Sequence, residues 1–155
     1  SLEDHFMQSF TINHPNVSLI KGKTYSLLRQ AKAALVTSGT ATLETALFGV
    51  PQVVCYKGSV VSYFFARYLV KVKFISLVNL IMNKAVVKEL IQDKLTEENL
   101  LKELSLLLND ENYRQQILAQ YAVLWNELGS SDASAKAAQS IYAFIKNEET
   151  GAPAK

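Results

Sequence analysis

Short apolar runs alternate with helix-like segments in the first half of the chain, and this alternation restricts the possible folds most. Residues 33–37 form an unbroken apolar run that ends at Ser38 and Gly39, and residues 52–56 form a second run. Strands that are apolar along their whole length are typical of parallel sheets buried on both faces. A helix between two such strands makes a right-handed crossover. The sequence therefore predicts an α/β fold with a parallel, Rossmann-like sheet and flanking helices.

The other expected elements follow from helix caps, apolar periodicity and β-propensity. Two further strands are predicted, at residues 16–20 and 74–77. Helices are predicted at residues 25–32 (capped by Thr24), 40–48 (closed by Gly49), 60–70, 85–92, from Thr96 along a leucine stripe to Leu108, 111–128 (capped by Asn109-Asp110 and ended by Gly129) and after Ser131-Asp132.

Composition excludes several classes of protein. The 16 lysines and arginines nearly balance the 14 aspartates and glutamates, so bulk charge does not indicate nucleic-acid binding. The one cysteine, Cys55, cannot form an internal disulfide, and the two scattered histidines do not complete a zinc finger with it. No apolar run reaches the ~18 residues that span a bilayer. We therefore expect a cytoplasmic protein with no metal site and no nucleic-acid partner.

The turn after the run at residues 33–37 carries the side chains most suited to chemistry. Gly39 lets a ligand approach the backbone closely, and the hydroxyls of Ser38, Thr40 and Thr42 lie near the start of the next helix. Exposed amides and the helix dipole favour an anion there, such as a nucleotide diphosphate. Glu44, one turn further on, can accept hydrogen bonds from two ribose hydroxyls. The alternative is that the hydroxyls only cap the helix and that the glutamate is solvated.

Two blocks of sequence give this turn a more specific interpretation. The first block is TSGTATLETA (37–46), which runs into GVPQVVCY (49–56), and the second is SLVNLI (76–81) followed by VVKELIQ (86–92). In order and spacing, both blocks resemble bacterial lipid-A-disaccharide synthases. That family is similar to other two-Rossmann (GT-B) glycosyltransferases, in which the C-terminal half binds the nucleotide-sugar donor.

The resemblance implies that this chain is the donor-binding part of such an enzyme. It implies inverting transfer from UDP-diacylglucosamine to diacylglucosamine 1-phosphate in lipid A biosynthesis, with release of UDP and with no metal or cofactor. Glu44 would hold the ribose, and the turn would face the diphosphate. The donor-binding residues that the resemblance implies are Ser38, Gly39, Thr40, Thr42, Glu44, Tyr56, Lys57 and Asn79.

The sequence pattern and the resemblance together predict a division of the chain. Residues 1–109 would be a partial Rossmann-like nucleotide-sugar-binding domain, residues 110–147 the C-terminal helices and residues 148–155 a frayed tail. The family's general base and acceptor residues lie in the N-terminal half, which this chain lacks. We therefore expect a truncated half of a two-Rossmann glycosyltransferase that is inactive by itself. The alternative is a non-catalytic nucleotide- or partner-binding α/β module.

One short segment departs from the family pattern. Asn83-Lys84-Ala85 stands where family members commonly carry a small residue (Gly or Asp) followed by Arg and Glu. Lys84 keeps a positive charge but not the forked guanidinium, and Ala85 lacks the carboxylate. A donor contact that relatives make through that acid is therefore not expected here.

Two segments suggest contacts beyond the substrate. Residues 59–73 combine aromatic and branched side chains with lysine and arginine, a composition that suits a helix in a membrane interface. Because the implied substrates are acylated, this helix would place the enzyme peripherally on the cytoplasmic face of the inner membrane; an ordinary crossover helix is the equal alternative. Tyr121, Leu124, Trp125 and Leu128 exceed what a solvated terminal helix needs, so we expect a second copy of the chain to cover them.

Overall fold

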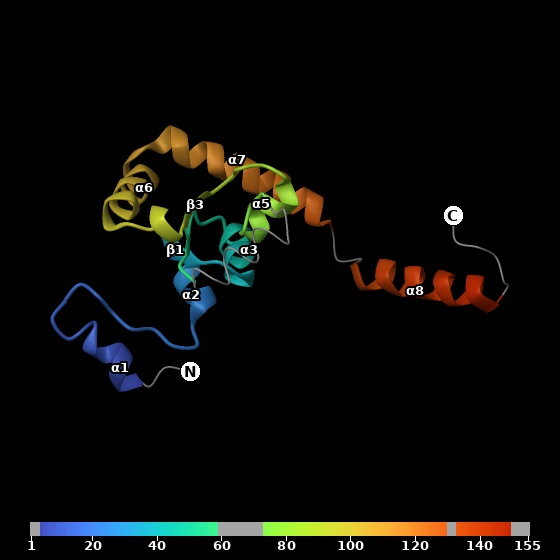
Figure 1. Cartoon of the computed structure of the whole chain (residues 1–155), viewed down its shortest axis with the longest axis horizontal. Coiled ribbons are helices and arrows are strands. Elements are labelled where there is room, and N and C mark those ends of the chain that lie inside the picture. Colours follow the sequence, from blue (N-terminus) through green and yellow to red (C-terminus); the bar gives the residue numbers. More distant parts are fainter. Residues whose placement is uncertain (1–3, 59–72, 130–132, 150–155) are drawn as a thin grey trace.

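The computed structural model describes residues 4–58, 73–129 and 133–149, and a three-stranded parallel sheet lies at its centre (Figure 1). The strands are β1 (Ala34–Thr37), β2 (Gln52–Tyr56) and β3 (Lys88–Ile91), in the order β1-β2-β3. The register pairs Val36 with Val54, and Val54 with Glu89. The predicted α/β class and the parallel sheet are confirmed.

Helices flank this sheet. The described helices are α1 (Asp4–Ser9), α2 (Thr24–Leu28), α3 (Thr40–Leu47), α5 (Leu77–Met82), α6 (Glu97–Asn109), α7 (Glu111–Leu128) and α8 (Ala133–Glu149), and a 3₁₀ turn, η1, spans Gln92–Lys94. Successive side chains of β3 point to opposite faces. Lys88 forms an ion pair with Glu103 of α6 at 3.5 Å, whereas Glu89 accepts hydrogen bonds at the start of α5. The sheet therefore lies between α6 on one side and α3 with α5 on the other (Figure 1).

Helix α7 packs at the amino ends of the strands. Its residues Ile117, Tyr121 and Leu124 are buried in the same apolar cluster as the sheet. Gln52, the first residue of β2, donates a hydrogen bond to the Tyr121 hydroxyl at 3.2 Å. Burial is the main cause that raises the pKa of Tyr121 well above its usual range. Because α7 occupies the amino ends, the carboxyl ends of β1 and β2 stay clear of it.

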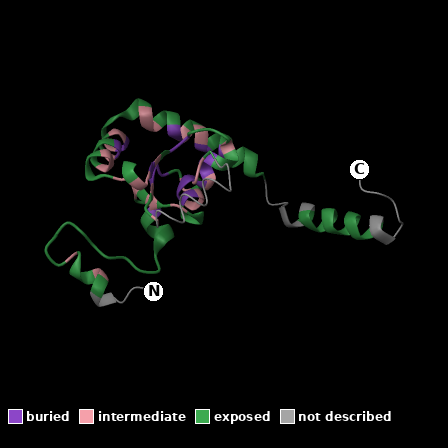
Figure 2. Cartoon of the chain, in the orientation of Figure 1, coloured by how far each residue is buried: buried purple, intermediate pink, exposed green. Residues whose placement is uncertain are grey.

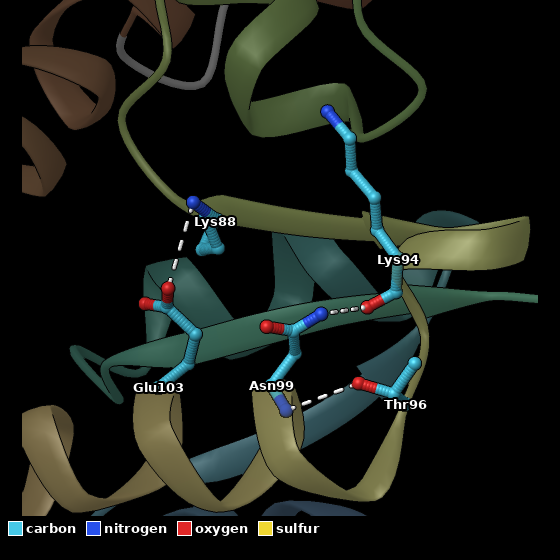
Figure 3. Close-up of polar contacts among 5 residues, drawn as sticks. All are labelled: Lys88, Lys94, Thr96, Asn99 and Glu103. Atoms are coloured by element: carbon cyan, nitrogen blue, oxygen red, sulfur yellow. Dashed lines mark hydrogen bonds and ion pairs between the residues drawn. The ribbon is translucent and has the colours of Figure 1, made fainter.

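Several predicted caps are confirmed. The Thr96 hydroxyl accepts from the Asn99 amide at 3.2 Å at the start of α6, and the Asp110 carboxylate accepts from the Tyr113 amide at 2.9 Å at the start of α7. The side chain of Asn99 does not complete a capping box, because it donates instead to the Lys94 carbonyl at 2.9 Å (Figure 3).

Three predicted elements are wrong. Residues 16–20 form an exposed loop, because no strand in the described part of the chain pairs with them. Residues 74–77 are not a strand: Ser76 is the N-cap of α5, and its hydroxyl accepts from the Asn79 amide. Residues 85–92 are not a helix: they contain β3, whose pairing with β2 buries Leu90 in the core. In the last case, burial against the sheet outweighed local helix propensity.

The helix predicted at residues 25–32 is shorter than expected. Helix α2 begins at Thr24 and ends at Leu28, and its N-cap residue is Lys23, whose side chain makes no capping hydrogen bond. The expected cap by Thr24 is therefore wrong. The stacked rings of Tyr25 and Phe48, 5.1 Å apart, join this short helix to the end of α3.

Strand β1 is less buried than its apolar sequence suggested. Leu35 is 48% exposed, since β1 is an edge strand and α6 packs chiefly against β2 and β3. The described side chains of α8 are also exposed, and this helix stands apart from the sheet (Figures 1 and 2). The helix predicted at residues 60–70 and the cap at Ser131-Asp132 lie outside the described residues.

Candidate functional site

The turn after β1 presents open backbone amides. Gly39 is the N-cap residue of α3 with φ 149° and ψ −164°, a conformation that is essentially restricted to glycine. No side chain caps this helix end, and no acceptor in the described chain takes the amides of Thr40 and Ala41. A Cβ built on Gly39 would meet no atom within 4 Å, so the space in front of the turn is open. These donors at a helix N-terminus suit an anion.

Two of the predicted hydroxyl residues hold the turn in place. Ser38 donates its amide hydrogen to the Cys55 carbonyl at 3.2 Å and its hydroxyl hydrogen to the Ile75 carbonyl at 3.0 Å. Thr42 is fully buried, and its hydroxyl donates to the Gly39 carbonyl at 2.8 Å. Neither side chain therefore has a hydrogen to offer a ligand, whereas the side chain of Thr40 is exposed.

Glu44 lies one turn into α3, beside a separate hollow. This half-buried carboxylate lines an open cavity of about 460 Å³ opposite the loop that leads into α2. The other lining residues are Gly22, Lys23, Thr24, Tyr25 and Ser26. The cavity thus places a carboxylate, a lysine and an aromatic ring around one space near the turn.

Tyr56 and Lys57 lie at the same edge of the sheet as the turn. Because Thr37 is paired with Cys55, the residues that follow each strand leave the sheet side by side. Both Tyr56 and Lys57 are exposed. The structure therefore brings together Ser38, Gly39 and Thr40 with this tyrosine–lysine pair.

Asn79 lies in the first turn of α5, bonded to the residues just before the amino end of β3, and is 1% exposed. Its Oδ1 accepts from the amides of Val86 and Val87 at 2.8 and 2.9 Å. Its Nδ2 donates to the Val87 carbonyl at 2.9 Å and to Glu89 Oε1 at 2.8 Å. The whole amide group is satisfied within the protein, so it joins the start of α5 to the strand that follows it.

Sequence reasoning missed Glu89 as a site residue. Its carboxylate accepts from the amides of Ile75 and Ser76, from the Ser76 hydroxyl and from Asn79. The predicted helix at residues 85–92 hid this role, because Glu89 in fact lies on strand β3. Lys88-Glu89-Leu90 shows no alternation of apolar and polar residues, so periodicity gave no signal for this role.

Residues 83–85 lie at the end of α5. Asn83 ends α5 in the left-handed conformation, with φ 47° and ψ 31°, which small or amide-bearing residues adopt most easily. Lys84 and Ala85 are exposed. Asn83 therefore suits the end of this helix.

A larger cavity, about 780 Å³, lies between β3 and α7 and is lined by Asn79, Lys84, Lys88 and Tyr113 among others. Burial, with a smaller effect of Glu103, raises the pKa of Tyr113. This cavity contains none of the residues of the open turn. Burial also raises the pKa of the Cys55 thiol, which therefore stays protonated as a packing residue at neutral pH.

Two kinds of feature are absent from the described residues. No group of three or more His, Cys, Asp or Glu side chains there could hold a metal ion. None of the helices described has the length and the apolar character to cross a bilayer.

The sheet is parallel, and a glycine turn after β1 leads into the uncapped helix α3. This arrangement defines an α/β protein of the Rossmann-like class. A family model described as Lipid-A-disaccharide synthetase matches residues 2–141. The chain belongs to the lipid-A-disaccharide synthetase family, and the resemblance of the two sequence blocks is confirmed.

Similar proteins agree with this assignment. Lipid-A-disaccharide synthases from Syntrophus aciditrophicus and Pasteurella multocida are 41% and 38% identical over 135 residues, which are 87% and 84% of this chain. The synthase from Solibacter usitatus is 36% identical over 146 residues, or 94% of the chain. The matched regions are 35%, 34% and 38% of these relatives, so the chain spans about a third of their length.

Proposed function

We propose that this chain is the donor-binding part of a lipid-A-disaccharide synthase. The enzyme would transfer a diacylglucosamine unit from UDP-diacylglucosamine to diacylglucosamine 1-phosphate and release UDP. The observation that carries this proposal is the uncapped start of α3, with open amides at the carboxyl edge of the sheet and Glu44 one turn further on. Family membership supplies the substrate class.

The proposed roles follow from which groups are open. The amides of Gly39, Thr40 and Ala41 would bind the diphosphate, and Lys57 would add a positive charge from the neighbouring strand. Tyr56 would line the same edge. Glu44 would accept hydrogen bonds from the two ribose hydroxyls, since a carboxylate offers acceptors for both.

Three of the predicted residues would act without touching the ligand. Ser38, Thr42 and Asn79 spend their hydrogen bonds inside the protein, so we assign them to the shape of the turn and of its support. The general base and the acceptor site would lie in the remaining two thirds of the enzyme. We therefore expect the chain alone to bind donor without turnover.

Titration of UDP against the full-length protein tests this function. Glu44→Gln keeps the size of the side chain but removes its charge, and it should weaken UDP binding about tenfold, the equivalent of one charge-assisted hydrogen bond. Glu103→Gln, the same change at a carboxylate on α6, is the matched control and should leave UDP affinity unchanged. The Glu44 variant should also lose its preference for UDP over 2′-deoxy-UDP. Equal UDP affinity in wild type and Glu44→Gln would remove the ribose role.

Peripheral membrane contact is a second part of the proposal. Residues 59–73 supply aromatic and basic side chains, and the proposed substrates carry acyl chains. Flotation of the full-length protein with anionic lipid vesicles, and with neutral vesicles as the control, tests this. If the protein is recovered equally in the unbound fraction with anionic and with neutral vesicles, the proposed membrane contact is contradicted.

Self-association is supported by exposed apolar side chains near the C-terminus. Trp125 of α7 is 60% exposed, and α8 exposes Ile141, Tyr142, Phe144 and Ile145. Tyr121 and Leu124, which the sequence predicts to be covered by a second copy, are instead part of the core. We propose that the exposed set contacts a second copy of the protein.

A further inference from the structure

One carboxylate holds the segment that precedes α5. Glu89 Oε1 accepts from the Ser76 amide at 3.0 Å, from the Ser76 hydroxyl at 2.7 Å and from Asn79 Nδ2 at 2.8 Å. Its Oε2 accepts from the Ile75 amide at 3.1 Å. Every one of these partners is a donor, as an ionised carboxylate requires, because it can only accept.

The peptide group between Ile75 and Ser76 is bound at both ends. Its N–H, which belongs to Ser76, points to Glu89, and its C=O, which belongs to Ile75, accepts the Ser38 hydroxyl hydrogen at 3.0 Å. A peptide group is planar, and its N–H and C=O point in opposite directions. Glu89 and Ser38 therefore hold one rigid unit from its two sides.

The sheet places both residues on one face. Val36, Val54 and Glu89 are neighbours in register across the three strands, so their side chains point the same way. Ser38 follows Val36 by two residues along the chain, so its side chain points to the same face just beyond the end of β1. The contact through Ile75 thus joins the outer strand β3 to the turn that follows β1 on the opposite edge.

Glu89 has no evident route to a ligand of its own. It is half-buried, and both oxygens are occupied by protein donors. Ser38 is likewise fully engaged, since its amide donates to the Cys55 carbonyl. What the pair fixes is the backbone immediately before Gly39, whose unusual φ orients the open amides.

We propose that Glu89 is a positioning residue for the anion-binding turn, acting through the Ile75–Ser76 peptide group and Ser38. This inference rests on the proposed binding of a nucleotide diphosphate at that turn. It predicts that loss of the Glu89 charge lowers affinity for the phosphates of the ligand and not for its nucleoside. A residue that only stabilised the fold would change neither selectively.

A double-mutant cycle in the full-length enzyme tests the inference. UDP and uridine are titrated against wild type, Glu89→Gln, Ser38→Ala and the double variant, with Glu103→Gln as the matched control. Each single variant should bind UDP about fivefold more weakly, the size of one ordinary hydrogen bond, with uridine affinity unchanged. The double variant should lose little more than either single variant, because both act through one peptide group.

Different outcomes test the positioning role of Glu89 and the proposed binding of UDP. The positioning role would be overturned if the double variant lost UDP affinity by the product of the two single losses. Equal losses of UDP and uridine affinity, or unchanged UDP affinity in Glu89→Gln, would also overturn it. A wild-type enzyme that binds UDP no better than uridine would instead refute the proposed function. If Glu89→Gln does not fold, Ser76→Ala takes its place in the cycle, since it removes the hydroxyl that donates to Glu89; additivity with Ser38→Ala then overturns the inference.

Discussion

Asn79→Ala is expected to be among the most destabilising single changes in this chain. The asparagine is 1% exposed, and its removal leaves the buried Val87 amide without its side-chain acceptor and the Val86 amide with the Lys84 carbonyl alone, at 3.0 Å. Each buried donor left without a partner costs about 1–3 kcal/mol. The Nδ2 hydrogen bonds to the Val87 carbonyl and to Glu89 are lost as well, so we expect a total loss of about 2–4 kcal/mol, a large fraction of the ~5–15 kcal/mol that stabilises a typical domain.

Urea unfolding of the full-length protein measures this loss from the transition that covers the present chain. Asn99→Ala is the matched control, because Asn99 makes one side-chain hydrogen bond, to the Lys94 carbonyl, at an exposed site. We expect the control to cost less than ~1 kcal/mol. Hydrogen exchange should also be faster at the Val87 amide in Asn79→Ala, with a smaller change at the Val86 amide, which keeps the Lys84 carbonyl as acceptor.

Asn79→Asp provides a second readout. It keeps an oxygen for the two valine amides but replaces the donor Nδ2 by an oxygen that faces Glu89 Oε1, 2.8 Å away in the native protein. Like charges at this separation repel, so the aspartate should destabilise the protein less at acidic pH than at neutral pH. Equal costs for Asn79→Ala and Asn99→Ala, with unchanged amide exchange, would refute the reasoning.

Three further predictions concern the turn, the core and the surface. Gly39→Ala should cost about 1–3 kcal/mol in urea unfolding and weaken UDP binding, because φ 149° is strained for alanine although the space is open; an unchanged midpoint and affinity would contradict this. Burial raises the pKa of the Tyr121 hydroxyl above the ordinary value of 10.0. Above that pH the unfolded chain therefore loses the hydroxyl proton more readily than the folded chain, and the free energy of unfolding falls as the pH rises. Tyr121→Phe should lack this part of the alkaline loss, which unfolding midpoints between about pH 9 and about pH 11 would show. Ile145→Lys on α8 should shift the full-length protein toward the monomer in light scattering, whereas Lys146→Glu, beside it, should have a smaller effect.

The sequence predicted those elements whose signals are local. The apolar runs of β1 and β2, the glycine that closes α3 and the caps of α6 and α7 all appear where expected. Such signals depend on neighbours within one turn of helix or one strand.

The misassigned elements depend on contacts between distant segments. The amides of Ile75 and Ser76 bond to a carboxylate on β3 instead of to a strand, and only the folded sheet brings that carboxylate near. Residues 88–91 became a strand because β2 was there to pair with them. Local propensity contains neither fact.

The candidate site was predictable in part for the same reason. The turn at Ser38, Gly39 and Thr40 could be located, because a glycine between an apolar strand and a helix is a local pattern. The sequence could not show which hydroxyls of the turn are free, because the Ser38 hydroxyl bonds to Ile75, 37 residues away along the chain.

The adjacent charges on β3 have a consequence for how the chain selects its fold. Lys88 meets Glu103 on one face, and Glu89 meets a group of N–H and O–H donors on the other. If β3 slipped by one residue against β2, every side chain would change face. Glu89 would then approach Glu103, and an aliphatic or cationic side chain would face the donors that the carboxylate now satisfies. Two neighbouring residues of opposite charge thus make the wrong strand register costly during folding, a specificity that an entirely apolar outer strand would lack.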